Sequence, residues 1–141
     1  MFINLKWHEN GNLAKINYYH DDDCMIKGYK FGPACIIFSE NGTITWKQWI
    51  LDGKLHRDEG AGPQFVSYSD DGTKIKEQYH TNGVCTRKDG PSKICWSLSG
   101  EITNEVYHVD GIPISKQEFN KLYGNTTKCK TCKASFIQKK K

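Results

Sequence analysis

Short segments of alternating apolar and polar residues run along the chain and are separated by turns that contain glycine. An aliphatic residue stands six positions before each glycine of one series, and an aromatic residue stands four positions before it. Positions two apart on a strand point to the same face, so each segment presents an aliphatic–aromatic pair to one side. The aliphatic positions are Leu5, Ile36, Val66 and Ile94, and the aromatic positions are Trp7, Phe38, Tyr68 and Trp96.

The segments belong to an internal repeat. Gly-Pro pairs begin at Gly32, Gly62 and Gly90, and nine residues after each proline a turn glycine follows. Another glycine, preceded by Asp or Asn, comes eleven residues later, and the successive copies are 30 and 28 residues apart. Seven residues after the first turn glycine, each copy again has an aromatic residue. These second aromatic positions are Tyr18, Trp49, Tyr79 and Tyr107.

Each copy is therefore predicted to form a strand, an Asn-Gly or Asp-Gly type turn, a second strand and a polar loop that ends in Gly-Pro. A single hairpin cannot bury its aromatic face, but stacked copies can. We expect an all-β fold, a single repeat array of about four antiparallel hairpins in a twisted meander sheet. The copies span about residues 5–32, 33–62, 63–90 and 91–114 within one domain of residues 1–124. The eight aromatic residues are expected to form two structural columns in this sheet.

A short helix is predicted to cap the last hairpin. The sequence from Ser115 to Glu118 is a capping box, with Ser115 as the N-cap. Phe119, Leu122 and Tyr123 then fall on one helical face, and Gly124 is suited to end the helix. The predicted helix covers about residues 116–123 within a cap of residues 115–124.

Composition agrees with a small β domain, since the chain has 13 glycines and 4 prolines in 141 residues. No segment has the length and hydropathy of a spanning helix, and the first residues lack the pattern of a signal peptide. We therefore expect a soluble, intracellular protein. The first four cysteines are expected to be reduced and partly buried: Cys24, Cys35, Cys85 and Cys95.

The formal net charge of +4 is unevenly distributed. Residues 125–141 hold six of the 20 basic residues and no acid, so the body keeps 14 basic against 16 acidic residues. This segment is predicted to be a flexible basic tail. Its lysines are candidates for contact with nucleic-acid phosphates or an anionic surface: Lys128, Lys130, Lys133, Lys139, Lys140 and Lys141.

The tail also contains Cys129 and Cys132, a CxxC pair that forms half of a structural zinc site. No second pair follows, so zinc would need ligands from the body or from another chain. Two thiols without metal in a disordered tail are the favoured interpretation, and the zinc site and a redox pair are the alternatives. We expect no cofactor.

The segment from Asp52 to Pro63 reads DGKLHRDEGAGP and resembles a family of short repeats grouped with the MORN-variant repeats, which are common in giant DNA viruses and large phages. Degenerate forms of the same element stand at residues 32–34 and 86–91, and residues 110–119 resemble the family's terminal helix. The resemblance covers about residues 5–123. The copies are longer than usual, and Gly60-Ala61 departs from the family pattern. The resemblance implies a β-hairpin array that serves as a scaffold or contact surface.

Few residues suggest catalysis. His56, Arg57 and Asp58 lie beside a turn, where a salt-bridged loop is the favoured interpretation. His80 and His108 share one position of the repeat, where an exposed pair is favoured over a metal site. The chain has no phosphate loop, no Gly-x-Ser-x-Gly and no His-Glu-x-x-His. It is not expected to be an enzyme.

The sequence therefore predicts a non-enzymatic protein-interaction or scaffold module, such as a minor structural component of a virus or phage particle. One alternative is a counter-defence protein that binds a small ligand or nucleotide, with the aromatic residues as a cage and Arg57 or Arg87 nearby. A third is nucleic-acid contact through the lysine-rich tail.

Overall fold

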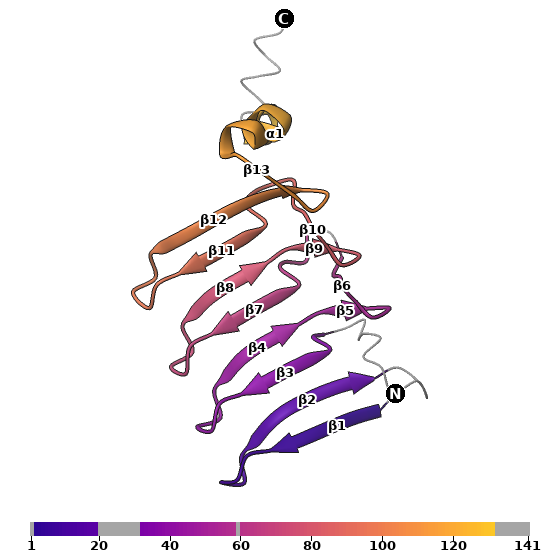
Figure 1. The fold of residues 1–141 in the computed structure, drawn as a ribbon, viewed down its shortest axis with the longest axis vertical. Coiled ribbons are helices and arrows are strands. Elements are labelled where there is room, and N and C mark those ends of the chain that lie inside the picture. The colour runs from indigo at the N-terminus through magenta and orange to yellow at the C-terminus, as the bar shows by residue number, and fades with distance from the viewer. Residues whose placement is uncertain (1, 20–31, 59, 132–141) are drawn as a thin grey trace, which may run out of the picture.

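The computed structural model describes residues 2–19, 32–58 and 60–131, and in this part of the chain one large antiparallel sheet forms the body of the molecule (Figure 1). Within these residues the sheet has nine strands in the order β1-β2-β3-β4-β7-β8-β11-β12-β13. Chain order and spatial order agree throughout, apart from side hairpins that leave the sheet. The predicted all-β meander with a C-terminal helix is confirmed.

The first turn of each copy joins the two main strands of that copy. Each turn glycine has a positive φ, such as 90° at Gly42, and its N–H donates to the carbonyl of the residue three positions earlier. A β-bulge beside the turn shifts the register by one residue in every copy. The strands joined in this way are β1 (Phe2–Trp7) with β2 (Leu13–Tyr19), β3 (Cys35–Phe38) with β4 (Ile44–Gln48), β7 (Phe65–Tyr68) with β8 (Lys74–Gln78), and β11 (Lys93–Trp96) with β12 (Ile102–Val109).

The pairing brings the repeated aliphatic positions into one row across a single face. The row reads Leu5, Ile16, Ile36, Lys47, Val66, Glu77, Ile94 and Glu105. Val66 and Ile94 are only 5% and 8% exposed, whereas Ile36 is half-buried. Full burial of such a side chain contributes roughly 1.5–3 kcal/mol, so Val66 and Ile94 each stabilise the sheet. On the opposite face, Trp46 and Phe65 meet edge to face with ring centroids 4.5 Å apart.

A second small hairpin follows in copies two, three and four, where the sequence predicted a polar loop. Both residues of each turn have a positive φ, for example Asn82 (49°) and Gly83 (82°), which defines a type I′ turn. The Asp-Gly and Asn-Gly pairs were the sequence signal for it. These strands are β5 (Ile50–Leu51) with β6 (Lys54–Leu55), β9 (His80–Thr81) with β10 (Val84–Cys85), and the end of β12 with β13 (Ile112–Ile114).

The small hairpins lie along one side of the sheet, where Figure 1 places β5, β6, β9 and β10. They contact one another through the backbone: the Gly83 N–H donates to Leu55 O at 2.9 Å, and the Gly111 N–H donates to Cys85 O at 2.9 Å. The array therefore has a second line of contacts between copies beside the main ladder.

The helix α1 (Lys116–Thr131) packs on the last copy. The Glu118 N–H donates to Ser115 Oγ at 3.1 Å, so Ser115 is the N-cap as predicted. Phe119 is 6% exposed and its ring centroid lies 4.7 Å from that of Tyr107.

The predicted end of this helix at residue 123 is wrong. Gly124 lies inside the helix without a positive φ, and the helix continues to Thr131. An interior glycine lowers helix stability by only about 1 kcal/mol, which does not force a helix to end. The helix therefore includes the start of the segment that the sequence assigned to a tail.

No helix within the described ranges is both long and apolar enough to cross a membrane.

Gly111→Ala and Gly124→Ala provide a matched test of this fold. A Cβ at Gly111, where φ is +84°, would lie 3.2 Å from Val84 Cγ1, so we expect a loss of about 1–2 kcal/mol of unfolding free energy. A Cβ at Gly124 meets only Asn120 Cβ at 3.7 Å, so alanine there should stabilise the protein by up to about 1 kcal/mol. Urea unfolding measures both changes. Equal effects of the two substitutions would contradict the assigned backbone.

Candidate functional site

Two arginines cover rings of the second aromatic column. The guanidinium carbon of Arg57 lies 4.1 Å from the centroid of the Trp49 ring, and that of Arg87 lies 3.8 Å from the centroid of Tyr79. Both distances are within the range of a cation–π contact. Copies two and three thus repeat the same stack.

The Gly-Pro pairs complete these stacks. The Nη1 of Arg57 donates to Pro63 O at 3.1 Å, and the Nη1 of Arg87 donates to Pro91 O at 3.0 Å. A Cβ on Gly62 would lie 2.9 Å from Arg57 Nη1, so glycine leaves the room that the guanidinium occupies. The Arg and Gly-Pro positions of the repeat are therefore two parts of one packing motif.

In the fourth copy, Phe119 of α1 takes the place of the arginine and lies against Tyr107. Burial of Tyr107 to 9% exposure follows from this contact. The loop that would cover Tyr18 in the first copy falls outside the described residues. In copies two, three and four, a side chain of the protein itself therefore lies against the ring at the second aromatic position.

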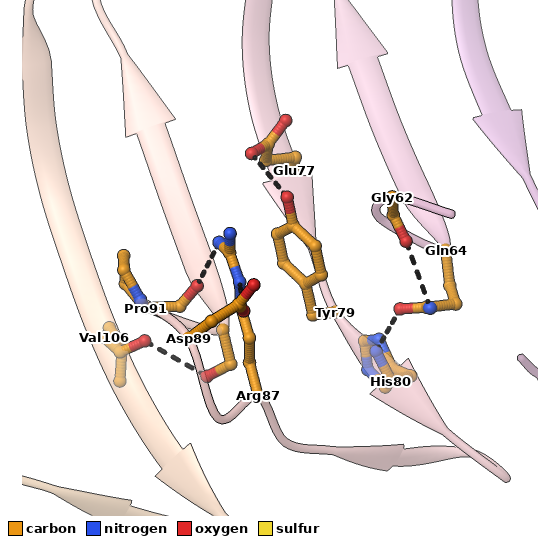
Figure 2. A network of polar contacts seen from close by, with 10 residues as sticks. Gly62, Gln64, Glu77, Tyr79, His80, Arg87, Asp89, Pro91 and Val106 are labelled. Carbon is orange, nitrogen blue, oxygen red and sulfur yellow. Dashed lines mark hydrogen bonds and ion pairs between the residues drawn. The ribbon is translucent and has the colours of Figure 1, made fainter. Parts of the chain in front are cut away.

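A polar network surrounds the third copy's stack (Figure 2). Arg87 Nε forms an ion pair with Asp89 at 2.7 Å, and Tyr79 Oη donates to Glu77 Oε1 at 3.2 Å. Burial raises the pKa of Tyr79, while the nearby Arg87 opposes that shift. These contacts hold the ring and the guanidinium in place.

Ser92 and His108 resemble a nucleophile and its base, because Ser92 Oγ lies 2.7 Å from His108 Nδ1. The same hydroxyl donates to Val106 O at 3.1 Å. Ser92 is also 0% exposed. A substrate therefore has no access to this hydroxyl, and the pair supports the strand ends.

His80 occupies the matching position in the third copy. Its backbone N–H donates to Gln64 Oε1, and the Gln64 amide donates to Gly62 O at 3.3 Å. His80 and His108 are 9% and 8% exposed, so the expectation of an exposed pair is wrong. Both histidines lie on strands of the second small hairpins, where the sequence predicted loops. Burial lowers the pKa of both imidazoles, and the positive charge of Lys93 lowers it further.

His56, Arg57 and Asp58 do not converge on a common point. His56 Nδ1 accepts a hydrogen bond from the Asn82 N–H at 3.2 Å, whereas Arg57 turns toward Trp49. The Asp58 carbonyl accepts a bond from a backbone N–H within its own loop. Three neighbouring residues with separate partners do not form a catalytic cluster.

The first aromatic column lies beside the bulges, where the sequence repeat placed it. Lys47 Nζ lies 5.7 Å from the Tyr68 ring centroid, and Lys74 Nζ lies 4.8 Å from that of Trp96. These rings are half-buried, while Trp7 at the end of the array is 61% exposed. The four positions, Trp7, Phe38, Tyr68 and Trp96, pair with Leu13, Ile44, Lys74 and Ile102 respectively.

The edge strand β1 is the largest exposed apolar element in the described part of the chain. All six of its residues are exposed, and four are large and apolar: Phe2 at 54%, Ile3 at 59%, Leu5 at 46% and Trp7 at 61%. Leu5 matches Val66 and Ile94 in the repeat, yet these are 5% and 8% exposed. Sequence reasoning missed this edge because it treated all four copies as equivalent.

The metal and anion candidates are only partly described. Cys129 lies in α1, but Cys132 and the last four tail lysines are outside the described residues. Within those residues, no three His, Cys, Asp or Glu side chains are close enough to hold a metal ion. The zinc half site and the tail's anion contact stay predictions.

Three cysteines of the described residues are free thiols: Cys35, Cys85 and Cys95. Burial raises the pKa of the Cys35 thiol, although Lys15 opposes the shift, so this thiol is held in its less reactive protonated form. Cys24 lies outside the described residues.

Comparisons with protein-family models, with curated proteins and with solved structures find no match to this chain. The resemblance to MORN-variant repeats therefore stays a prediction from the sequence.

Arg87→Ala should destabilise the protein by about 1–2 kcal/mol, because it removes a ring contact and a hydrogen bond to Pro91. Lys88→Ala in the same loop is the control, since Lys88 is exposed. Thermal and urea unfolding give the two values. An Arg87→Ala variant as stable as the control would contradict the packing role.

The two buried histidines predict a pH dependence of stability. Their pKa in the folded chain is below the ordinary 6.5, so the unfolded chain binds more protons and the folded state loses stability as pH falls below about 6.5. His80→Ile should reduce this loss, because Ile50 fills the matching position of copy two. Unfolding free energies measured at about pH 7.5 and about pH 5 test it. Identical losses in both proteins would refute the assignment.

Proposed function

We propose that this chain is a non-enzymatic protein-interaction module that accepts a partner's strand at the β1 edge. The observation that carries the proposal is the exposure of Leu5 and Trp7 at positions that interior copies bury or half-bury. An edge strand offers a row of unpaired backbone N–H and C=O groups, and an incoming strand can pair with them. Side chains of the added strand would then cover the apolar residues of β1.

The opposite edge of the sheet is covered in part: β13 pairs with Tyr107–Val109 of β12, while Ile102–Glu105 of β12 are exposed. The strand β13 has three residues and includes Pro113, which has no N–H to donate. The helix α1 follows it and packs on the same copy. In contrast, β1 has six residues and contains no proline.

The arrangement of polar side chains supports a non-enzymatic role. Ser92 is enclosed, His108 is bonded to it, and Arg57 and Arg87 lie against rings of the fold. These candidate groups all have structural partners.

The same stacks weigh against the alternative in which a nucleotide lies in a cage of the second aromatic column. Arg57, Arg87 and Phe119 already lie against the rings of Trp49, Tyr79 and Tyr107 respectively. Nucleic-acid contact through the tail depends largely on the four of its six lysines that lie outside the described residues. The resemblance to MORN-variant repeats supports a place in a virus or phage particle, and the β1 edge is compatible with a subunit contact there.

A photo-crosslinking amino acid at position 5, in protein expressed in cells, tests the proposal. We expect covalent protein adducts from this position, and mass spectrometry of the crosslinked peptides identifies what is bound. The same reagent at position 98 is the control, since Leu98 is 69% exposed but lies in a turn of the fourth copy. Adducts at position 5 that do not exceed those at position 98 would overturn the proposal.

A further inference from the structure

We infer that the strand that docks on β1 is β1 of a second copy of this chain, in a two-fold symmetric dimer with a continuous sheet. This inference rests on the proposed use of β1 as a docking edge and adds the identity of the partner. Direction, register and side-chain chemistry support it.

The direction follows from the array itself. Each later first strand, β3, β7 or β11, has the second strand of the preceding copy as an antiparallel neighbour. The strand β1 lacks such a neighbour among the described residues. A two-fold axis perpendicular to the sheet also makes two β1 strands antiparallel, so a second copy provides the direction that the array uses.

The register follows from the position of Leu5 in the repeat. Its counterpart in copy two, Ile36, pairs with the aliphatic Ile16 of the preceding strand, whereas Val66 and Ile94 pair with Lys47 and Glu77. The backbone N–H and C=O groups of Leu5 are therefore oriented toward the free edge in the same way as those of Ile36 are oriented toward β2. If the two-fold axis passes beside Leu5, this residue faces Leu5 of the other copy, and the aliphatic row continues across the dimer.

The flanking pairs in this register are chemically compatible. Ile3 then faces Trp7 of the other copy on the same side of the sheet as the aliphatic row, so the two most exposed side chains of β1 cover each other. On the opposite side, Lys6 faces Asn4. Lys6 already lies opposite Lys15 within the chain, and this register adds no further positive charge opposite it.

The interface is small, because one pair of strands forms it. It therefore buries less than the roughly 1,600 Å² of a standard stable complex. We accordingly expect a dimer that dissociates on dilution and that one substitution can disrupt.

Sedimentation velocity of the purified full-length chain over a wide range of concentrations tests for the dimer. We expect the average mass to rise from monomer to dimer. Leu5→Lys places two like charges opposite each other at the axis, and we expect it to weaken dimerisation at least about 100-fold. Leu98→Lys is the control for an added surface charge. Circular dichroism of each variant establishes that it is folded.

A disulfide at the axis tests the register. Antiparallel partners lie about 4.5–5.5 Å apart at Cα, within the range that a disulfide spans. Oxidation of a Leu5→Cys variant should give a disulfide dimer between the two substituted positions, identified by peptide mass spectrometry. Leu98→Cys should give no more than collisional crosslinking.

The outcomes separate this inference from the proposed function. A chain that stays monomeric, or a Leu5→Cys variant that crosslinks no faster than Leu98→Cys, refutes the β1 dimer. If position 5 still forms adducts with a different protein in cells, the interaction module stands and its partner is another chain. Dimers that persist in Leu5→Lys refute the assignment of the interface to β1.

Discussion

The backbone ladder that runs without interruption from β1 to β13 is the feature on which the rest of the structure depends. Its register fixes which side chains share a row, so the aliphatic positions of four separate copies become one surface. The bulge beside each first turn repeats with the turn and keeps the copies in phase. Since each copy pairs with its neighbours, stability accumulates along the array.

A second interaction, the stacking of arginine side chains on aromatic rings, joins the loops to the main sheet. In copies two and three the polypeptide leaves the sheet after the second strand, forms a small hairpin and returns so that Arg57 or Arg87 lies over a ring of its own copy. The proline carbonyl of the Gly-Pro pair accepts a hydrogen bond from the guanidinium, just before the next strand begins. In the last copy, Phe119 replaces this cation, which explains how a helix can close an array of hairpins.

The two ends of the array therefore differ in character. At one end, α1 covers Tyr107, and Pro113 removes a donor from the short edge strand. At the other end, Leu5 and Trp7 are exposed at positions that belong to the buried or half-buried rows of the interior copies. Where the repetition of equivalent units stops, positions that the interior copies cover are exposed, and here these positions lie on β1.

The sequence by itself determined the strands, the first turns and the cap, because glycine phase, period-two alternation and a capping box are local signals. It identified the repeated aromatic positions by residue number, but it did not reveal that Arg57 and Arg87 would lie against the rings of Trp49 and Tyr79. The burial of His80 and His108, the continuation of α1 past Gly124 and the openness of β1 were decided by the tertiary structure. Each depends on what packs beside a residue, and neighbours that come from distant parts of the chain leave no periodic trace in the sequence.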